Sequence, residues 1–158
     1  MRCLVTGGAG FIGSNLVNRL VSDGHEVIIF DDLSTGRKEN INTDAKFFLI
    51  DISNKDSFQT QTMKDIMNGV DVVFHLAAFA RVEPSIEEPI LAHNINVNGT
   101  LNILNASRLN GVKRVVFTSS SAVYGDAEEI PTSEFYIPNP MSPYALHKLI
   151  GEQYCKLF

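Results

Sequence analysis

A tyrosine and a lysine stand four positions apart near the end of the chain, at Tyr144 and Lys148. Residues at this spacing lie on one face of a helix. Ser142 fits the N-cap of that helix and Pro143 its first turn, which places Tyr144 at the positive end of the helix dipole. The dipole and a nearby ammonium both favour the phenolate form of a tyrosine phenol, a group whose ordinary pKa is about 10. The pair is therefore a candidate acid/base, although a surface Tyr and Lys on an ordinary helix have the same spacing.

Near the start of the chain, Gly7, Gly10 and Gly13 follow a short apolar strand and precede apolar residues at helical spacing. Glycine permits the turn, lets the backbone approach a diphosphate and allows close packing of helix on strand. The N-terminus of the helix supplies amide donors to the phosphates. This turn therefore predicts a dinucleotide site.

Acidic residues follow the next two apolar strands. Asp31 comes 18 residues after Gly13, where a carboxylate accepts hydrogen bonds from ribose hydroxyls and repels a 2′-phosphate. NAD is therefore favoured over NADP, although Asp31 could also be an ordinary acid of a strand-end turn. Asp51 is a candidate to hold the adenine amino group, with Ile52 packing on the ring.

Five further residues, at strand ends or on a helix, carry weaker signals. Leu76, Ala77 and Ala78 follow the fourth strand, and small side chains there would let the backbone pass close to a cofactor or simply make a tight turn. Asn96 falls within a long predicted helix, where it is either a cofactor contact or an exposed residue. Ser120 ends the fifth strand and is placed to hydrogen-bond a substrate oxygen while Tyr144 moves its proton.

The elements that must position these residues alternate along the chain. Apolar runs predict strands at 3–5, 27–30, 47–50, 70–76 and 115–117; helical patterns cover 11–21, 55–67 and 90–110 and begin again at 143, and 125–141 is expected to be a loop. Near-continuous apolar strands that alternate with helices predict an α/β fold, a doubly wound parallel sheet covered on both faces. Residues 1–158 are expected to form one domain.

The composition narrows the class of protein. A net charge of −5 without a basic run argues against binding nucleic acid or a membrane surface. Only two cysteines are present, so a disulfide framework is not expected, and the motifs contain no metal-ligand cluster. There is no signal peptide and no apolar run near the roughly 20 residues of a membrane span, which predicts a cytoplasmic location.

Taken together, these motifs resemble the extended short-chain dehydrogenase/reductase family, and within it the UDP-glucose 4-epimerase-like nucleotide-sugar enzymes. The resemblance rests on residues 6–14, 31–36, 51–52, 75–78, 96–100 and 119–125 and on Tyr144 with Lys148. It implies a Rossmann-type fold with NAD as the cofactor. The cofactor-binding residues that it implies are Gly7, Gly10, Phe11, Ile12, Gly13, Asp31, Asp32, Asp51, Ile52, Leu76, Ala77, Ala78, Asn96, Tyr144 and Lys148.

The resemblance also implies a reaction. Tyr144 would take the proton from a sugar hydroxyl as hydride passes to NAD, and a 4-keto sugar would form, rotate and receive the hydride on its other face. Ser120 would be the hydroxyl partner of Tyr144, and Lys148 would hold the nicotinamide ribose. Family members that dehydrate or decarboxylate carry a carboxylate just after this serine, whereas this chain has Ser121 and Ala122. Epimerisation of a UDP-sugar is therefore preferred.

The chain departs from the family pattern in two places. Bacterial epimerases have a lysine where this chain has Ala80, and Arg81 either replaces it on the cofactor side or faces solvent. Family members are also longer, and their later half supplies the last strands and the nucleotide-sugar lobe, so this chain is expected to be a fragment.

Two other functions stay open on the sequence, a non-catalytic NAD-binding module and a net oxidoreductase or dehydratase of the same family. A homodimer is expected by the resemblance, with Leu149, Ile150 and Tyr154 as contributors, although these side chains fit a core equally well.

Overall fold

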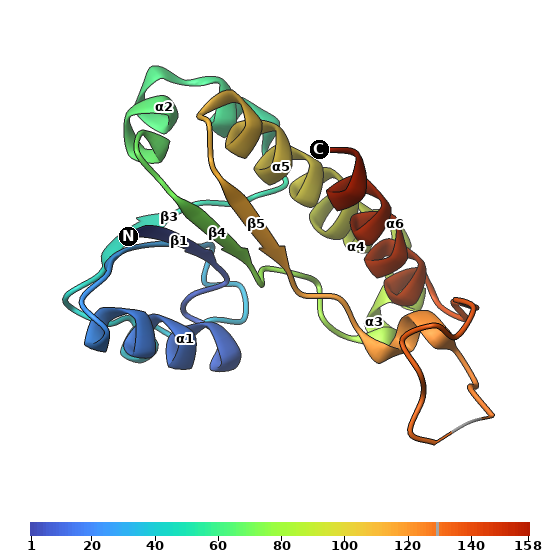
Figure 1. Cartoon of the computed structure of the whole chain (residues 1–158). Coiled ribbons are helices and arrows are strands. Elements are labelled where there is room, and N and C mark those ends of the chain that lie inside the picture. Colours follow the sequence, from blue (N-terminus) through green and yellow to red (C-terminus); the bar gives the residue numbers. More distant parts are fainter. Residues whose placement is uncertain (129) are drawn as a thin grey trace.

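The protein is described by a computed structural model that covers residues 1–128 and 130–158. Its sheet has five parallel strands in the order β3-β2-β1-β4-β5 (Figure 1). The strands are β1 (Arg2–Thr6), β2 (Glu26–Asp31), β3 (Lys46–Leu49), β4 (Val72–His75) and β5 (Arg114–Phe117). The strand order changes direction between β1 and β4, and in sheets of this kind a ligand crevice opens at that point, beyond the carboxyl ends of the strands.

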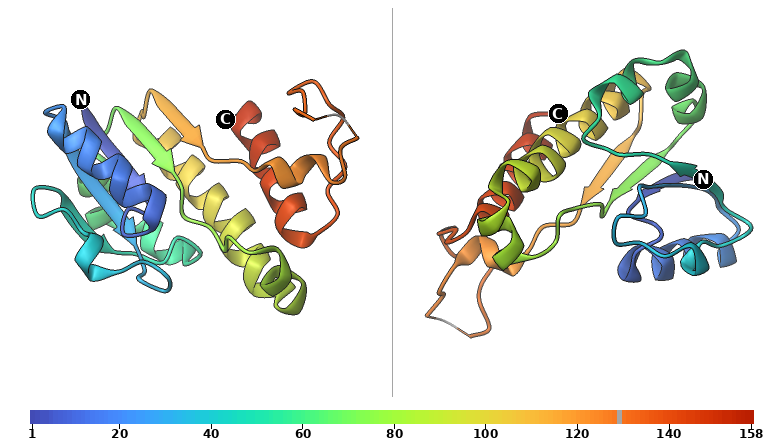
Figure 2. Two further views of the ribbon diagram at one scale, coloured as in Figure 1. Left: turned by 90° about the horizontal axis from the view of Figure 1, so that it is seen from below. Right: turned by 180° about the vertical axis from the view of Figure 1, so that it is seen from behind.

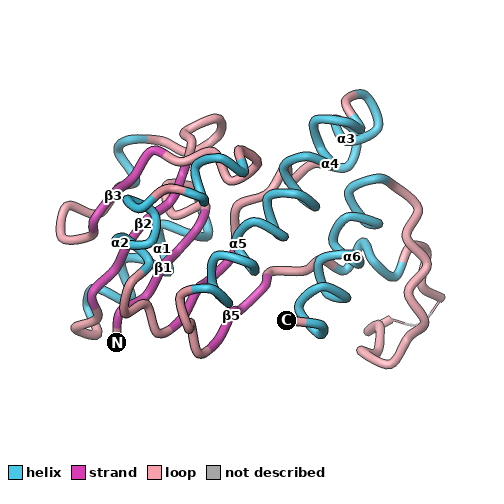
Figure 3. The backbone as a smooth tube through the Cα atoms, turned by 90° about the horizontal axis from the view of Figure 1, so that it is seen from above, coloured by secondary structure: helices cyan, strands magenta, loops and turns pink. Residues whose placement is uncertain are grey.

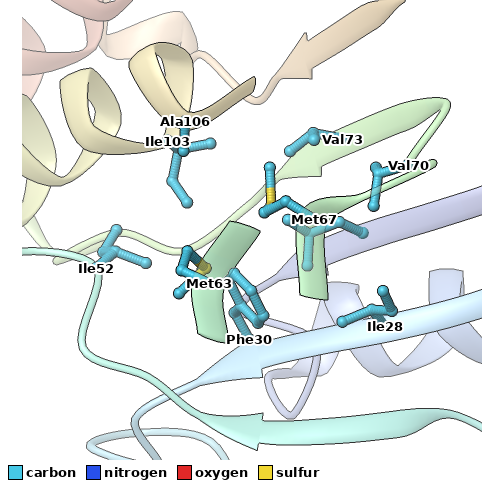
Figure 4. Close-up of a cluster of buried hydrophobic side chains, with 10 residues drawn as sticks. Ile28, Phe30, Ile52, Met63, Met67, Val70, Val73, Ile103 and Ala106 are labelled. Carbon is cyan, nitrogen blue, oxygen red and sulfur yellow. The ribbon is translucent and has the colours of Figure 1, made fainter. Parts of the chain in front are cut away.

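Helices cover both faces of the sheet, as predicted (Figure 2). The helix α1 (Phe11–Ser22) packs on one face, where its Val17 and Leu20 join the buried side chains of β1 and β2. On the other face lie α2 (Gln61–Met67) and α5 (Gly99–Leu109), with Met63, Met67 and Ile103 around Phe30 of β2 (Figure 4). The long helix α6 (Pro143–Leu157) lies beside α5 (Figure 3). The doubly wound parallel sheet is thereby confirmed.

The predicted helix 55–67 is wrong as a single element. The chain instead forms a 3₁₀ helix, η2 (Lys55–Gln59), and then α2, with Thr60 between them. The backbone of Thr60 is extended, and its side-chain oxygen accepts a hydrogen bond from the amide of Met63 at 3.1 Å. Thr60 therefore acts as the N-cap of a new helix, which the apolar periodicity alone could not indicate.

The predicted helix 90–110 is present but interrupted. It consists of α4 (Pro89–His93), a π-helical turn η3 (Asn94–Asn98) and α5. A short helix that the sequence analysis did not predict, α3 (Val82–Glu87), precedes it. Inserted π-turns of this kind are frequent at functional sites.

The end of the described chain agrees with the prediction. A 3₁₀ turn, η4 (Ser121–Tyr124), is followed by a long connection that has no helix or strand in its described residues. Earlier in the chain, a further 3₁₀ turn, η1 (Lys38–Asn40), lies after β2. The helix α6 begins at Pro143, and Ser142 caps it by accepting a hydrogen bond from the amide of Ala145 at 3.1 Å. Within 1–128 and 130–158, none of the helices has the length and apolar character needed to cross a bilayer.

Candidate cofactor-binding and catalytic site

The glycine turn is closed on itself and on the next strand. Gly7 has a φ of +72° and its amide donates to the carbonyl of Phe30 at 2.8 Å. A Cβ on Gly13 would lie 2.0 Å from the carbonyl oxygen of Gly7, and one on Gly7 would lie 2.8 Å from the backbone nitrogen of Ala77. A side chain at Gly13 would therefore push α1 away from the end of β1. A side chain at Gly7 would push the loop after β1 away from the loop after β4.

The N-terminus of α1 is open to a ligand. Its N-cap is Gly10, which has no side chain to accept from the first-turn amides. Phe11 and Ile12 in that turn are 84% and 63% exposed. Uncapped amides with the positive end of a helix dipole form an anion site. These features fit the diphosphate of a dinucleotide.

Asp31 is held rigidly at the end of β2 and is 7% exposed. Its two carboxylate oxygens accept from the amides of Ala9 and Leu33, each at 2.9 Å. A carboxylate has about four lone-pair sites, so it retains acceptor capacity for ribose hydroxyls. The neighbouring Asp32 is exposed and accepts from the amide and hydroxyl of Ser34 at 2.9 and 2.6 Å.

A cavity of about 530 Å³ lies at the carboxyl edge of the sheet, a volume in the range of small-molecule sites. It brings together seven of the predicted cofactor residues: Gly7, Asp31, Asp32, Asp51, Ile52, Ala77 and Ala78. Its other lining residues are not among the predicted cofactor contacts: Phe30, Ser34, Thr35, Ile50, Phe79, Ala80, Pro84 and Ile95. Arg81 also lines the cavity, so of its two predicted positions the structure favours the cofactor side over solvent. Asp51 presents a carboxylate that also accepts from Ser53.

Leu76 and Asn96 are not among the residues that line the cavity. Asn96 is buried, and its side-chain amide forms two hydrogen bonds with the backbone of Phe79. It accepts one from the Phe79 N–H at 2.7 Å and donates the other to the Phe79 carbonyl at 3.1 Å. Because Asn96 belongs to η3, its side chain fixes the loop after β4 to that turn. A direct contact between Asn96 and the cofactor stays a prediction.

A buried chain of hydrogen bonds connects this loop to the glycine turn. Thr6 contacts Nδ1 of His75 at 2.7 Å, and Nε2 of His75 contacts the hydroxyl of Thr100 at 2.9 Å. The Thr100 hydroxyl donates to the carbonyl of Asn96 at 2.6 Å, so it accepts from Nε2, and Thr6 donates to Nδ1. The Thr6 hydroxyl oxygen in turn accepts from the amide of Ala77 at 3.2 Å. Only the neutral ring satisfies this pattern.

Burial of the His75 ring, assisted by the positive charge of Lys148, lowers the pKa of His75 to about 3. The signal in the sequence was a histidine at the end of an apolar strand. The sequence could not show that Thr6 and Thr100, 69 and 25 residues away, complete its hydrogen bonds.

The predicted acid/base pair lies on one face of α6. The ammonium of Lys148 is 5.9 Å from the centroid of the Tyr144 ring and 5.0 Å from that of Phe117. It is 4% exposed and donates to the carbonyl of Thr118 at 2.7 Å, and burial lowers its pKa to about 8. An ammonium has three donors, so this hydrogen bond leaves capacity for a ligand.

Contacts between α6 and the end of β5 set the position of Ser120. A Cβ on Gly151 would lie 2.4 Å from the Phe117 ring, and Ser119 donates to a carboxylate oxygen of Glu152 at 2.5 Å. Ser120 caps η4 by accepting from the amide of Ala122 at 3.2 Å, and η4 packs against α6. Ser120 and Tyr144 are thus carried by elements in contact, although neither lines the 530 Å³ cavity.

The chain is similar to known proteins over nearly its whole length. The model of the NAD dependent epimerase/dehydratase family matches residues 3–158. A putative UDP-glucose 4-epimerase of Methanocaldococcus jannaschii is 47% identical over 156 residues, which is 98% of this chain and 50% of that protein.

Two solved structures have the same fold. A UDP-glucose 4-epimerase of Thermotoga maritima with UDP-glucose has a TM-score of 0.92 and 39% identity, and one of Thermus thermophilus with NAD has a TM-score of 0.92 and 40% identity. Each alignment covers 99% of this chain and 50% of the other. The chain thus spans about half the length of the relatives that it matches.

Proposed function

Because the chain belongs to the NAD dependent epimerase/dehydratase family, we propose that it supplies the NAD-binding half and the acid/base group of a nucleotide-sugar epimerase. The observation that carries the proposal is the Tyr144–Lys148 pair, held against the loop after β5, in a fold whose sheet edge also has a cavity with a rigid carboxylate at Asp31. UDP-glucose and UDP-galactose are the proposed substrates, on the strength of the relatives named above.

The described residues fit NAD. The uncapped amides of α1 would hold the diphosphate, and Asp31 would accept from the adenosine ribose. Asp51, which also lines the cavity, would hold the adenine amino group, and Lys148 would donate to the nicotinamide ribose with its free N–H groups. NAD, when bound, supplies a hydride acceptor and donor.

Tyr144 would remove the proton from the sugar hydroxyl and return it in the second half of the reaction, with Ser120 hydrogen-bonded to the same oxygen. A 4-keto sugar would be the intermediate. Ser121 and Ala122 follow Ser120 at the start of η4 and carry no carboxylate to eliminate water. Epimerisation is therefore proposed rather than dehydration.

The chain as it stands has a second candidate function, NAD binding without turnover. This candidate is favoured by the coverage of only half of each relative. Homodimerisation through Leu149, Ile150 and Tyr154, which are half-buried on α6, and a cytoplasmic location stay predictions from the sequence.

A substitution of Tyr144 by Phe tests the proposal, with Tyr154→Phe on the same helix as the control. NAD binding is followed by calorimetry, and interconversion of UDP-galactose and UDP-glucose by a coupled assay. We expect Tyr144→Phe to bind NAD as the wild type does and to lose about 10²- to 10⁴-fold in turnover, the usual contribution of a positioned acid/base. Equal turnover in Tyr144→Phe and wild type would refute the role of Tyr144. Wild-type NAD binding without turnover would support the second candidate.

A further inference from the structure

The charge on the wall of the 530 Å³ cavity is unbalanced. Its described lining has three carboxylates, Asp31, Asp32 and Asp51, and one cationic side chain, Arg81. A nucleotide diphosphate carries about two negative charges, and a wall with a surplus of carboxylates repels it. The amides of α1 offer only partial positive charge. Arg81 is therefore the one described side chain of this wall that can supply a full counter-charge to a diphosphate.

The backbone that carries Arg81 is fixed at both ends. Two residues before it, Phe79 is held by the amide of Asn96. Arg81 itself is the N-cap of α3, and its carbonyl accepts from the amide of Ser85 at 3.3 Å. The hydroxyl of Ser85 in turn accepts from the amide of Tyr144 at 3.1 Å. The backbone at Arg81 thus connects a loop that lines the cavity with α3, which is hydrogen-bonded to the helix of the acid/base pair.

The guanidinium of Arg81 is uncommitted. Within 1–128 and 130–158 it forms no ion pair with a carboxylate, and the Arg81 side chain makes no capping hydrogen bond to α3. The residue is exposed. The arginine fork matches the oxygens of a phosphate in a bidentate arrangement. An exposed arginine on an anchored backbone can bind a diphosphate without giving up an existing partner.

We propose that Arg81 binds the diphosphate of a nucleotide at this cavity. The inference rests on the proposed function for the identity of the nucleotides but adds a binding residue to it. Two sources supply the same chemistry, the ADP half of NAD and the UDP half of the sugar nucleotide. In the proposed function Asp31 and Asp51, which line the same cavity as Arg81, hold the adenosine, and this makes the ADP half the first to be tested.

The experiment measures calorimetric affinities of the full chain for ADP-ribose, UDP and adenosine. The variants are Arg81→Gln, which removes the charge, and Arg81→Lys, which keeps the charge but not the fork. Arg37→Gln is the matched control, because Arg37 is exposed and is not among the residues that line the cavity. Titrations at low and high salt report the charge that each variant contributes.

We expect Arg81→Gln to weaken a diphosphate ligand by about tenfold to a hundredfold, to reduce the salt dependence and to leave adenosine unchanged. Arg81→Lys should recover part of the loss, and Arg37→Gln should match the wild type. A loss confined to ADP-ribose assigns the cofactor, and a loss confined to UDP assigns the substrate. Unchanged diphosphate affinity, or an equal loss for adenosine, would overturn the role of Arg81. Failure of the wild type to bind adenosine and ADP-ribose would instead count against the proposed function.

Discussion

The buried imidazole of His75 makes the stability of this protein depend on pH in a predictable direction. His75 is 1% exposed, and its pKa of about 3 lies below the ordinary 6.5. The unfolded chain therefore binds a proton that the folded chain excludes as the pH falls below about 6.5. Stability contributed by the neutral ring is present at pH 7 and is lost from about pH 6.5 toward pH 3.

The size of the effect follows from the two pKa values. Well below pH 6.5 the loss approaches about 1.4 kcal/mol for each pH unit. Between pH 7 and pH 5 the loss from this one group comes to about 2 kcal/mol, a large part of the stability of an ordinary domain.

The assay is urea unfolding at pH 7, 6 and 5 for the wild type, His75→Gln and Thr6→Val. The Gln variant cannot titrate and should lose about 2 kcal/mol less than the wild type over this range. Thr6→Val removes the hydroxyl that donates to Nδ1, so it should be less stable at pH 7 yet remain sensitive to acid, because burial is the main cause of the lowered pKa. Parallel pH profiles for the wild type and His75→Gln would refute this explanation.

Two further substitutions test the architecture of the cavity. Gly13→Ala should destabilise the chain by about 1–3 kcal/mol and abolish measurable NAD binding, because its Cβ would lie 2.0 Å from the carbonyl oxygen of Gly7. Urea midpoints measure the stability and calorimetry measures the NAD affinity, and an affinity equal to that of the wild type would contradict the expected clash. Asn96→Ala should lower the free energy of unfolding by about 1–3 kcal/mol and weaken NAD binding, because the backbone of Phe79 loses its hydrogen-bond partners. The control Asn98→Ala loses only an exposed hydrogen bond to Asn94 and should stay near the wild type in the same assays. Equal effects of the two substitutions would show that the Phe79 contact is unimportant.

Much of the fold was readable because its signals are local. The apolar strands, the glycine turn and the capped start of α6 each depend on residues within a few positions of one another. Thr60 was missed because a capping threonine inside a helical pattern interrupts the helix only when its backbone extends. The helix α3 was missed because its six residues are too few to show a periodicity.

The residue types of the site came from the sequence by itself: Gly7, Gly10 and Gly13 before a helix, Asp31 at the end of a strand, and Tyr144 and Lys148 on one helical face. Each follows from the period of a helix or strand, which a short stretch of chain determines. Only the tertiary structure decided how the side chains are used. It directed the amide of Asn96 to Phe79, closed the hydrogen bonds of His75 and placed Arg81 in the wall of the cavity. Those contacts join segments brought together by the crossovers of the sheet, and no local pattern encodes them.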